Sequence, residues 1–325
     1  MIKELRERIA DQPVGLGVAA IGRPGYMTLT HDEDLPDKSR PAMEKQAHQL
    51  FDLAWQHGVR YFDTARSYGD GENFLASWLK SRNISKSEVV IGSKWGYVYT
   101  ANWQVKAAKH EIKYHTIENL NKQWEESKSI LGDYLHIYHI HSATMESGVL
   151  ENKTILDRLY EIKQTGVIVG LSLTGVRQAE ILKKALAIKY DGALLFGSVQ
   201  ATWNLLETSV QEELKIAKSA GLFIILKELM ANGRIPALSS DHLNPSQIET
   251  IQLLGKELQL TADQVAINAA LQLGIADIVL SGAANEAHLL SNLKISEHRL
   301  DLKKLDRISQ KPEDFWQERS ELEWI

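Results

Sequence analysis

Short runs of consecutive apolar residues recur along the chain, and amphipathic stretches separate most of them. The apolar runs cover residues 14–20, 60–62, 88–93, 135–140, 167–173, 193–199, 222–226 and 276–281. Apolar residues at helical spacings of three and four cover 41–57, 70–82, 115–131, 153–165, 175–188, 207–220 and 261–273. Continuous apolar character is typical of strands that are covered on both faces, as in a parallel sheet wrapped by helices. The pattern therefore predicts eight strands that alternate with helices.

Glycine marks several of the predicted boundaries. Gly58, Gly166 and Gly221 each follow a helical stretch and precede an apolar run. A helix commonly ends on a residue in the left-handed conformation, which glycine adopts without steric cost. Thr261 precedes the stretch that begins at Ala262, so its hydroxyl is placed to satisfy free N–H groups as an N-cap.

Eight strand–helix repeats fit a closed (β/α)8 barrel, the TIM-barrel fold of the α/β class, or an open doubly wound sheet. In the first strand-to-helix connection, Gly15, Gly17 and Gly22 do not match the G-x-G-x-x-G phosphate loop of the open sheet. We therefore predict the barrel. The sequence carries no low-complexity tract or fixed repeat, so we expect residues 1–325 to form a single domain.

Composition narrows the function classes. The net charge of −5 gives no sign of a basic surface for nucleic acid or anionic lipid. The chain has no cysteine, which excludes disulfides, thiolate metal sites and cysteine nucleophiles. The first residues are charged and polar, unlike a secretory signal, and no apolar stretch approaches the length of a membrane span, about 18 residues. We expect a cytoplasmic protein without nucleic-acid or membrane partners.

Two connections are long and would lie on the C-terminal face of the barrel, where catalysis occurs in this fold. They cover residues 21–40 and 95–114. The second is rich in aromatic residues, which either wall an apolar substrate pocket or pack the loop onto the barrel. From these connections we take Tyr26, Trp95 and Trp103 as candidate pocket residues.

Four ionisable residues fall at the ends of three consecutive predicted strands. Asp63 ends the second strand and Tyr68 follows five residues later, Lys94 ends the third, and His141 ends the fourth. Adjacent strand ends converge at one face of a barrel, so these side chains are expected to share one patch. A carboxylate, a phenol, an amine and an imidazole together suit proton donation to a carbonyl.

The expected roles follow from acidity. A free phenol has a pKa of about 10, and a nearby ammonium favours the phenolate and lowers that value. We expect Lys94 to act in this way on Tyr68, with Asp63 orienting Lys94 and His141 holding the carbonyl oxygen. Such a site provides a proton and no electrons, so it also needs a bound hydride donor.

Four segments resemble the aldo-keto reductase superfamily: GVRYFDTARSYGDGE at 58–72, SKWG at 93–96, IHS at 140–142 and SGAANEAHLLSN at 281–292. The resemblance runs from about residue 14 to about residue 295. It implies a metal-free, NADPH-dependent oxidoreductase on a TIM barrel that acts on a small carbonyl or alcohol. It also implies that Tyr68 is the general acid, that Lys94 and Asp63 tune it, and that His141 directs the carbonyl.

The resemblance also implies a nicotinamide site, which this chain matches in part. Ser172 and Gln200 match family positions, whereas Leu173 replaces an expected asparagine. The seventh strand should carry an aromatic that stacks on the nicotinamide. Leu226, Lys227 and Glu228 stand there instead, and a Lys227–Glu228 pair is a possible polar replacement.

At the adenosine end, Asn292 matches the asparagine that contacts adenine in the family. Gly282 stands where many members have a lysine for the 2′-phosphate, and His288 stands where arginine or glutamine is common. With fewer cations, discrimination between NADP and NAD is expected to be weak unless Arg234 compensates. We therefore expect NADP as the cofactor, with NAD possible.

Three other interpretations stay open. His139 and His141 alternate on one strand face, as metal ligands of a barrel hydrolase do, although the other strand ends offer no further histidine. The altered nicotinamide contacts also fit a nucleotide-binding regulatory subunit with slow turnover. An NAD-dependent sugar or alcohol dehydrogenase shares the same four residues.

The tail at 315–325 either closes over the substrate side or caps the barrel.

Overall fold

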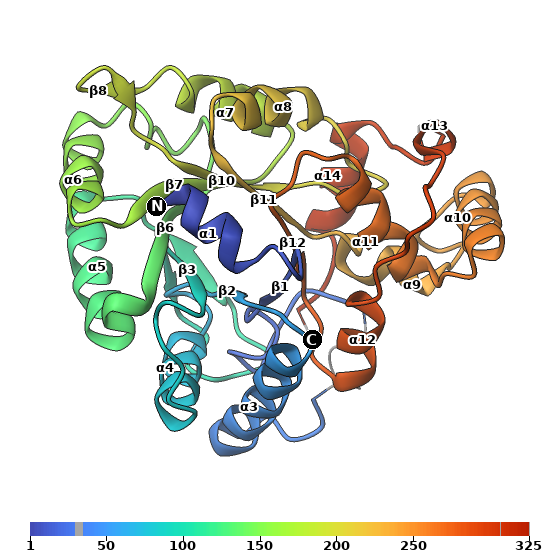
Figure 1. The fold of residues 1–325 in the computed structure, drawn as a ribbon, viewed down its shortest axis with the longest axis horizontal. Coiled ribbons are helices and arrows are strands. Elements are labelled where there is room, and N and C mark those ends of the chain that lie inside the picture. The colour runs from blue at the N-terminus through green and yellow to red at the C-terminus, as the bar shows by residue number, and fades with distance from the viewer. Residues whose placement is uncertain (30–34, 306, 325) are drawn as a thin grey trace.

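The computed structural model describes residues 1–325 except 30–34, 306 and 325. Eight parallel strands close into a barrel in the order β1-β12-β11-β10-β7-β6-β3-β2, with helices around the outside (Figure 1). The predicted TIM-barrel fold is confirmed. The barrel strands are β1 (Val14–Gly17), β2 (Tyr61–Asp63), β3 (Val90–Trp95), β6 (Leu135–Ala143), β7 (Ile168–Leu173), β10 (Ser198–Thr202), β11 (Phe223–Lys227) and β12 (Ile278–Ser281).

The helices that cover the barrel follow the predicted amphipathic stretches closely, because their apolar faces pack against the strands, except that no stretch was predicted for the last of them. They are α3 (Arg40–Gln56), α4 (Gly71–Ser81), α5 (Ile117–Leu131), α6 (Lys153–Gln164), α7 (Gln178–Ala185), α8 (Gln211–Ser219), α11 (Ala262–Gln272) and α12 (Glu286–Asn292). Outside this repeat lie α1 (Ile2–Arg8), α9 (Arg234–Ala237), α10 (Pro245–Leu258), α13 (Leu302–Leu305) and α14 (Pro312–Ser320).

The predicted helix boundaries at these glycines and at Thr261 are confirmed. Gly58, Gly166 and Gly221 have φ values of 84°, 92° and 92°, in the left-handed region where a side chain would be strained. Thr261 is the N-cap of α11, and the Gln264 side chain accepts a hydrogen bond from its N–H at 3.2 Å.

Two strand-level expectations need correction. The apolar run 193–199 is not one strand, because Ala193–Leu194 forms β9 of a small hairpin with β8 (Lys189–Tyr190) and the barrel strand begins at Ser198. The long connection 95–114 is not only loop, since β4 (Tyr97–Tyr99) and β5 (Glu111–Lys113) form an antiparallel hairpin within it. The connection 21–40 is described except for residues 30–34.

Helix α1 lies across the N-terminal end of the barrel, shown in blue in Figure 1. Its Leu5 is 1% exposed and joins the cluster of strand side chains that fills this end, including Tyr61, Phe223 and Ile278. Arg6 of α1 donates from Nε to Oδ1 of the buried Asp277 at 2.9 Å, which ties the helix to the start of β12. This end of the barrel is therefore sealed, and the opposite end carries the cavity.

No helix in the described part of the chain is long and apolar enough to cross a membrane.

Replacing Leu5 with alanine should lower the free energy of unfolding by about 2–5 kcal/mol, because the deleted methyl groups leave a void in a closed core. The site lies at the other end of the barrel, so ligand affinities should stay unchanged. Urea unfolding followed by circular dichroism measures the loss. Leu253→Ala, at a side chain that is 52% exposed, is the matched control. Equal stability of the two variants would show that α1 is not part of the core.

Candidate active site

The four predicted ionisable residues meet at the C-terminal end of the barrel. The Tyr68 hydroxyl lies 3.5 Å from Lys94 Nζ and 3.5 Å from His141 Nε2. Lys94 Nζ donates to the Asp63 carboxylate and, at 2.9 Å, to the Thr64 carbonyl oxygen. Three adjacent strands, β2, β3 and β6, thus place a phenol, an ammonium and an imidazole around one point.

The Asp63 carboxylate is held from across the barrel as well. Gln200, on β10, donates from Nε2 to Asp63 Oδ1 at 2.8 Å. Because β2 and β10 lie on opposite sides of the closed sheet, this bond spans the barrel interior. Asp63 and Lys94 are 3% and 1% exposed, so the ion pair is buried with its hydrogen-bonding capacity used.

The strand β6 is irregular at His141. The register with β7 shifts between Ile140 and Ala143, and Ser142 has a φ of 53°. The Ser142 N–H donates to Ser172 Oγ at 2.8 Å, which fixes the distorted backbone to β7. His141 points to the same side of the strand as the core residue His139, as strand alternation predicts, so its imidazole faces Tyr68 and the bulge displaces the backbone beside it.

Burial governs the acidity of the site. It raises the pKa of Tyr68 well above its usual value, and the Asp63 charge acts in the same direction. The pKa of Tyr68 is thus raised on balance, where a lowering by Lys94 was expected, and Arg23 is the cation that acts against the rise. Burial also lowers the pKa of Lys94, against the favourable Asp63 partner. Burial and the Lys94 charge hold the pKa of His141 well below its usual value, so this imidazole is neutral.

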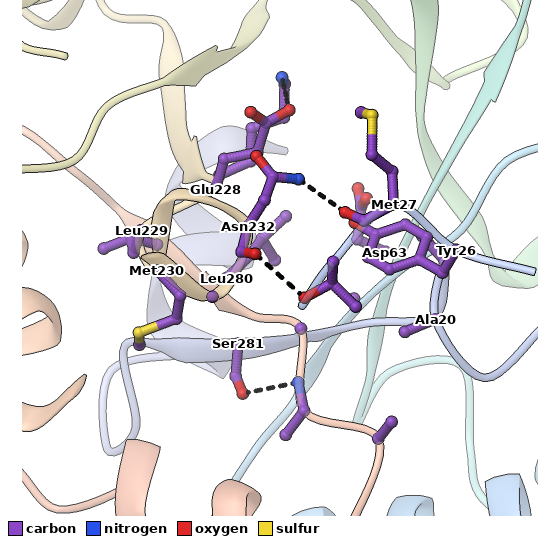
Figure 2. A pocket seen from close by; sticks show the side chains of 18 of the residues that line it. Ala20, Tyr26, Met27, Asp63, Glu228, Leu229, Met230, Asn232, Leu280 and Ser281 are labelled. Atoms are coloured by element: carbon purple, nitrogen blue, oxygen red, sulfur yellow. Dashed lines mark hydrogen bonds and ion pairs between the residues drawn. The ribbon is translucent and has the colours of Figure 1, made fainter. Parts of the chain in front are cut away.

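A cavity of about 590 Å³ opens onto these residues. It extends from Tyr68 and His141, past the ends of β10 and β11, to the end of β12 and to α12. Figure 2 shows Tyr26 and Asp63 on one side of the cavity, Leu229 and Met230 on another, and Ser281 at the β12 end. Its size is in the range of small-molecule and cofactor sites, about 300–1,000 Å³.

Most of the predicted site residues reach this cavity. Besides Asp63, Tyr68 and His141, the lining includes Tyr26, Gln200, Lys227, Gly282, His288 and Asn292. Lys94 and Ser172 lie behind the lining residues, where they contact Tyr68 and the Ser142 backbone. Leu226 points into the core between barrel and helices, because successive strand residues alternate and Lys227 faces the cavity.

Two predicted pocket residues lie outside the cavity lining. Trp95 is fully buried and packs against His115 at a ring distance of 5.5 Å. Trp103 donates from Nε1 to the Lys38 carbonyl oxygen at 2.8 Å and packs edge-on against Phe74. Of the two alternatives for these tryptophans, packing of the connection onto the barrel is the one observed. Tyr97, from the same connection, does line the cavity.

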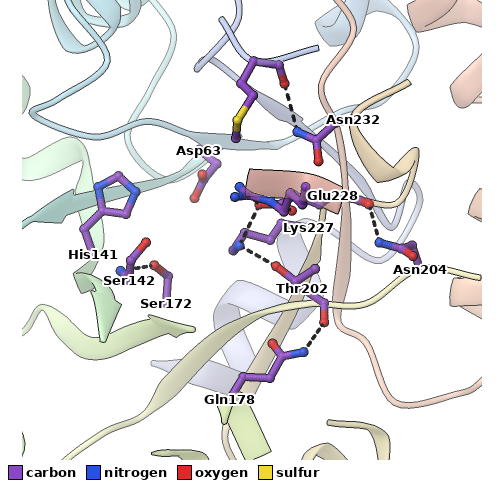
Figure 3. A network of polar contacts seen from close by, with 12 residues as sticks. Asp63, His141, Ser142, Ser172, Gln178, Thr202, Asn204, Lys227, Glu228 and Asn232 are labelled. Carbon is purple, nitrogen blue, oxygen red and sulfur yellow. Dashed lines mark hydrogen bonds and ion pairs between the residues drawn. The ribbon is translucent and has the colours of Figure 1, made fainter. Parts of the chain in front are cut away.

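The predicted Lys227–Glu228 pair is present and forms part of a larger network (Figure 3). Lys227 Nζ donates to Thr202 Oγ1 at 2.6 Å and to Glu228 Oε1 at 3.1 Å. Arg319, on α14, binds the same carboxylate with two hydrogen bonds of 2.7 and 2.8 Å. Burial opposes ionisation of Glu228, yet these two cations outweigh it and hold its pKa well below its usual value.

The lining residues that the sequence reasoning missed include Arg23, Glu111, Arg319 and Trp324. Arg23 and Glu111 form an ion pair with N–O 2.7 Å. Arg319 and Trp324 come from the C-terminal segment, so the tail does reach over the cavity, as one of the two alternatives held. In the sequence, only the mixture of polar and aromatic residues in the tail pointed to this position. The residues that the tail contacts are far away in the sequence and leave no local signal.

Arg234 does not take up the role suggested for it. It is 1% exposed, donates to Glu318 at 2.8 Å and lies 4.4 Å from the Phe315 ring centre. It anchors α14 and is not among the described lining residues. At the β12 end, Asn292 accepts from Ser281 Oγ at 2.7 Å and donates to Asp263 at 2.9 Å, so its amide is already oriented.

His139 lies in the barrel core, with Nε2 3.0 Å from Ser198 Oγ. Within the described residues, no group of three or more histidine, aspartate or glutamate side chains is arranged to hold a metal ion.

The sequence profile of the aldo/keto reductase family matches residues 25–313. The chain belongs to this family. Among curated proteins, it is 24% identical to pyridoxal reductase of Arabidopsis thaliana over 63% of this chain and 55% of that protein. It is 24% identical to pyridoxal 4-dehydrogenase of Microbacterium luteolum over 61% of this chain and 65% of that protein. The chain thus spans between half and two thirds of the length of these relatives.

Solved structures show the same fold. An aldo-keto reductase from Bacillus halodurans in its holo form aligns with a TM-score of 0.68 at 16% identity, covering 92% of each chain. An aldo-keto reductase from a deep-sea metagenome library aligns with a TM-score of 0.62 at 18% identity, covering 92% of this chain and 91% of that one.

Replacing Arg319 with methionine should lower the free energy of unfolding by about 3 kcal/mol at neutral pH, because Glu228 loses its principal partner while buried. The double variant Arg319→Met/Glu228→Gln should recover much of the loss. The pKa of Glu228 is lower in the folded than in the unfolded protein, so its ionisation stabilises the folded state. This stabilisation is complete above the ordinary pKa of about 4.5 and is lost as the pH falls toward the pKa in the folded protein.

Urea unfolding at neutral pH and in acid measures this difference. Arg177→Met, which removes an exposed pair with Glu180, is the matched control, with an expected change of no more than about 0.5 kcal/mol. A loss in Arg319→Met no larger than in Arg177→Met would contradict the assigned role of the network.

Proposed function

We propose that this protein is an NAD(P)H-dependent oxidoreductase that reduces an aldehyde or ketone to an alcohol, or catalyses the reverse reaction. One observation carries the proposal: the Tyr68 hydroxyl stands at the cavity within 3.5 Å of both Lys94 Nζ and His141 Nε2. A proton donor, an ion-paired ammonium and a neutral imidazole around one point suit a carbonyl that is becoming an alkoxide.

Tyr68 gives its proton to the carbonyl oxygen. Its raised pKa keeps the phenol protonated at neutral pH, so the acid is loaded before reaction. The developing alkoxide is about as basic as hydroxide, whose conjugate acid water has a pKa of about 15.7, so proton transfer stays favourable. Lys94, held by Asp63, lies beside the phenolate oxygen that results.

His141 orients the carbonyl as a neutral group. Ser67 Oγ lies 3.4 Å from its Nδ1. If the serine hydroxyl donates there, the network assigns the proton to Nε2, which then points a donor at the same space as Tyr68. The carbonyl oxygen would accept from both residues.

The cavity residues fit a nicotinamide dinucleotide, which supplies the hydride when bound. Gln200, Ser142 and Lys227 would hold the nicotinamide end, close to Tyr68, with Ser172 fixing Ser142. His288 and Asn292 would hold the adenosine end. A Cβ at Gly282 would meet no atom within 4 Å, so room for a ligand is open there. The Leu226 side chain points into the core and would not contact the nucleotide.

The substrate class we propose is a small carbonyl or alcohol bearing a ring. Tyr26, Tyr97 and Trp324 line the cavity around the acid and offer flat apolar faces, and two of the relatives are named for pyridoxal. The experiment is nucleotide titration followed by a carbonyl panel that includes pyridoxal. Nucleotide binding without any turnover would favour the slow regulatory subunit instead.

Tyr68→Phe should reduce the rate of carbonyl reduction by about 10²-fold or more while nucleotide affinity stays nearly unchanged, because only the transferable proton is lost. Steady-state kinetics and nucleotide titration measure the two effects. Tyr190→Phe, whose hydroxyl bonds Asp157 away from the cavity, is the matched control. Substantial activity in Tyr68→Phe would remove this tyrosine from the mechanism.

The affinities for NADPH and NADH should differ by less than about tenfold, or 1.4 kcal/mol. The described lining carries three cations, Arg23, Lys227 and Arg319, and carboxylates already pair all of them. At the β12 end the charged lining side chain is Asp263, which disfavours a 2′-phosphate.

Quenching of tryptophan fluorescence measures both dissociation constants. Gly282→Lys places a cation in open space and should strengthen NADPH binding selectively. A wild-type preference for NADPH above about a hundredfold would contradict this reading of the adenosine end.

A further inference from the structure

A second cation lies against the tyrosine that we propose as the acid. Arg23 is 3% exposed, and its Cζ is 5.2 Å from the centre of the Tyr68 ring. The same guanidinium lies 4.7 Å from the Trp324 ring centre and 5.9 Å from that of Tyr26. A cation at these distances is attracted to the face of an aromatic ring, and more strongly once that ring carries a negative charge.

The backbone fixes this arrangement. The Gly22 carbonyl oxygen accepts from the Asp70 N–H at 2.9 Å. A Cβ at Gly22 would stand 2.5 Å from the Tyr68 carbonyl oxygen, and one at Gly69 would stand 2.5 Å from the Gly22 carbonyl oxygen. The connection after β1 and the turn after β2 therefore interlock at glycines, and Arg23 cannot shift independently of Tyr68.

Two hydrogen bonds hold the guanidinium in place. Arg23 Nη1 donates to the Ser67 carbonyl oxygen at 3.0 Å and to Glu111 Oε2 at 2.7 Å. Ser67 belongs to the same turn as Tyr68, so the cation is anchored on the segment that carries the phenol. Arg23 Nε is buried without a hydrogen-bond partner, so interactions with the surrounding rings hold that side of the guanidinium.

The other charges around Tyr68 explain why such a cation matters. Asp63 neutralises Lys94 and disfavours a phenolate, as Glu111 and Glu228 do from farther away, whereas Arg23 favours it. His141 is neutral. The groups that face Tyr68 or act on it electrostatically come from every wall of the cavity: Arg23, Tyr26, Asp63, Lys94, Glu111, His141, Lys227, Glu228 and Arg319.

We propose that Arg23 is a positioning residue for Tyr68: its guanidinium, packed on the phenol ring and anchored to Ser67 and Glu111, stabilises the charge that the ring carries after giving up its proton. This inference rests on the proposed role of Tyr68 as the acid. Lys94 stabilises the Tyr68 phenolate only in part, because Asp63 neutralises its charge, and Arg23 supplies the rest.

The test reads the phenol directly. Tyr68→3,5-difluorotyrosine introduces a label of nearly the same size, and fluorination makes the phenol more acidic, which brings its titration into an accessible pH range. Fluorine NMR then follows ionisation at this one position without substrate, nucleotide or turnover. The titration is compared in the otherwise wild-type chain and with Arg23→Met, Arg23→Lys or Glu111→Gln added.

Arg23→Met should raise the titration midpoint by about one pH unit or more, because an opposite charge within about 6 Å is lost. Arg23→Lys keeps a cation and should restore part of the difference. Glu111→Gln leaves Arg23 in place without its counter-charge and should lower the midpoint. If Arg23 had only a structural role, Arg23→Met and Glu111→Gln would not shift the midpoint in opposite directions, since both variants would loosen the same contact.

Equal midpoints, or shifts of the same sign in Arg23→Met and Glu111→Gln, would overturn the inference. Should Arg23→Met fail to fold, Arg23→Gln, which keeps a polar side chain and removes the charge, takes its place, and its midpoint must rise. Absence of turnover with NADPH, NADH and the carbonyl panel would refute the proposed reductase activity and leave the titration result standing.

Discussion

The buried ion pair between Asp63 and Lys94 is the interaction on which the rest of the site depends. Removing two charges from water is costly, and the pair persists because Gln200 and the Thr64 carbonyl oxygen satisfy the remaining hydrogen bonds. Gln200 reaches Asp63 from the opposite side of the barrel, so closure of the sheet is a condition for the pair. In turn, the pair fixes the Lys94 ammonium beside the Tyr68 hydroxyl, while β6 supplies His141.

Ion pairs of the same kind build the walls of the cavity. Arg23 and Glu111 join the connection after β1 to the β4–β5 hairpin, and Glu228 and Arg319 join the end of β11 to the C-terminal helix. The first pair joins two connections outside the barrel repeat and the second joins α14 to a strand end, where Glu228 also binds Lys227. The cavity is therefore lined by many charges and has little excess charge, which suits a ligand with separate polar groups better than one bound by net charge alone.

The sequence predicted the strand ends well, because the period of apolar residues and the glycines at helix ends are local signals. Asp63, Tyr68, Lys94 and His141 followed from those ends. The sixth strand was misplaced because a hairpin took up part of the same apolar run. Trp95 was misjudged because it is the last residue of β3 and points away from Lys94, into the core between barrel and helices. Trp103 was misjudged because the direction of a side chain in a loop depends on what packs beneath it. Arg23 and Arg319 were missed because their partners are distant in sequence, and burial, which raises the pKa of Tyr68, has no local signature.

The C-terminal segment and the acid are coupled through one side chain. Arg23 packs on the Tyr68 ring and also on the Trp324 ring, and Trp324 in turn stacks on His110 at 4.2 Å between ring centres. Covering Arg23 removes water from the phenol, which strengthens every charge interaction there and at the same time raises the cost of forming the phenolate. Desolvation alone would make Tyr68 a worse acid. Covering by the tail is useful only because the covered residue, Arg23, is a cation. The same contact excludes water from the phenol and places beside it a charge that compensates for the lost solvation.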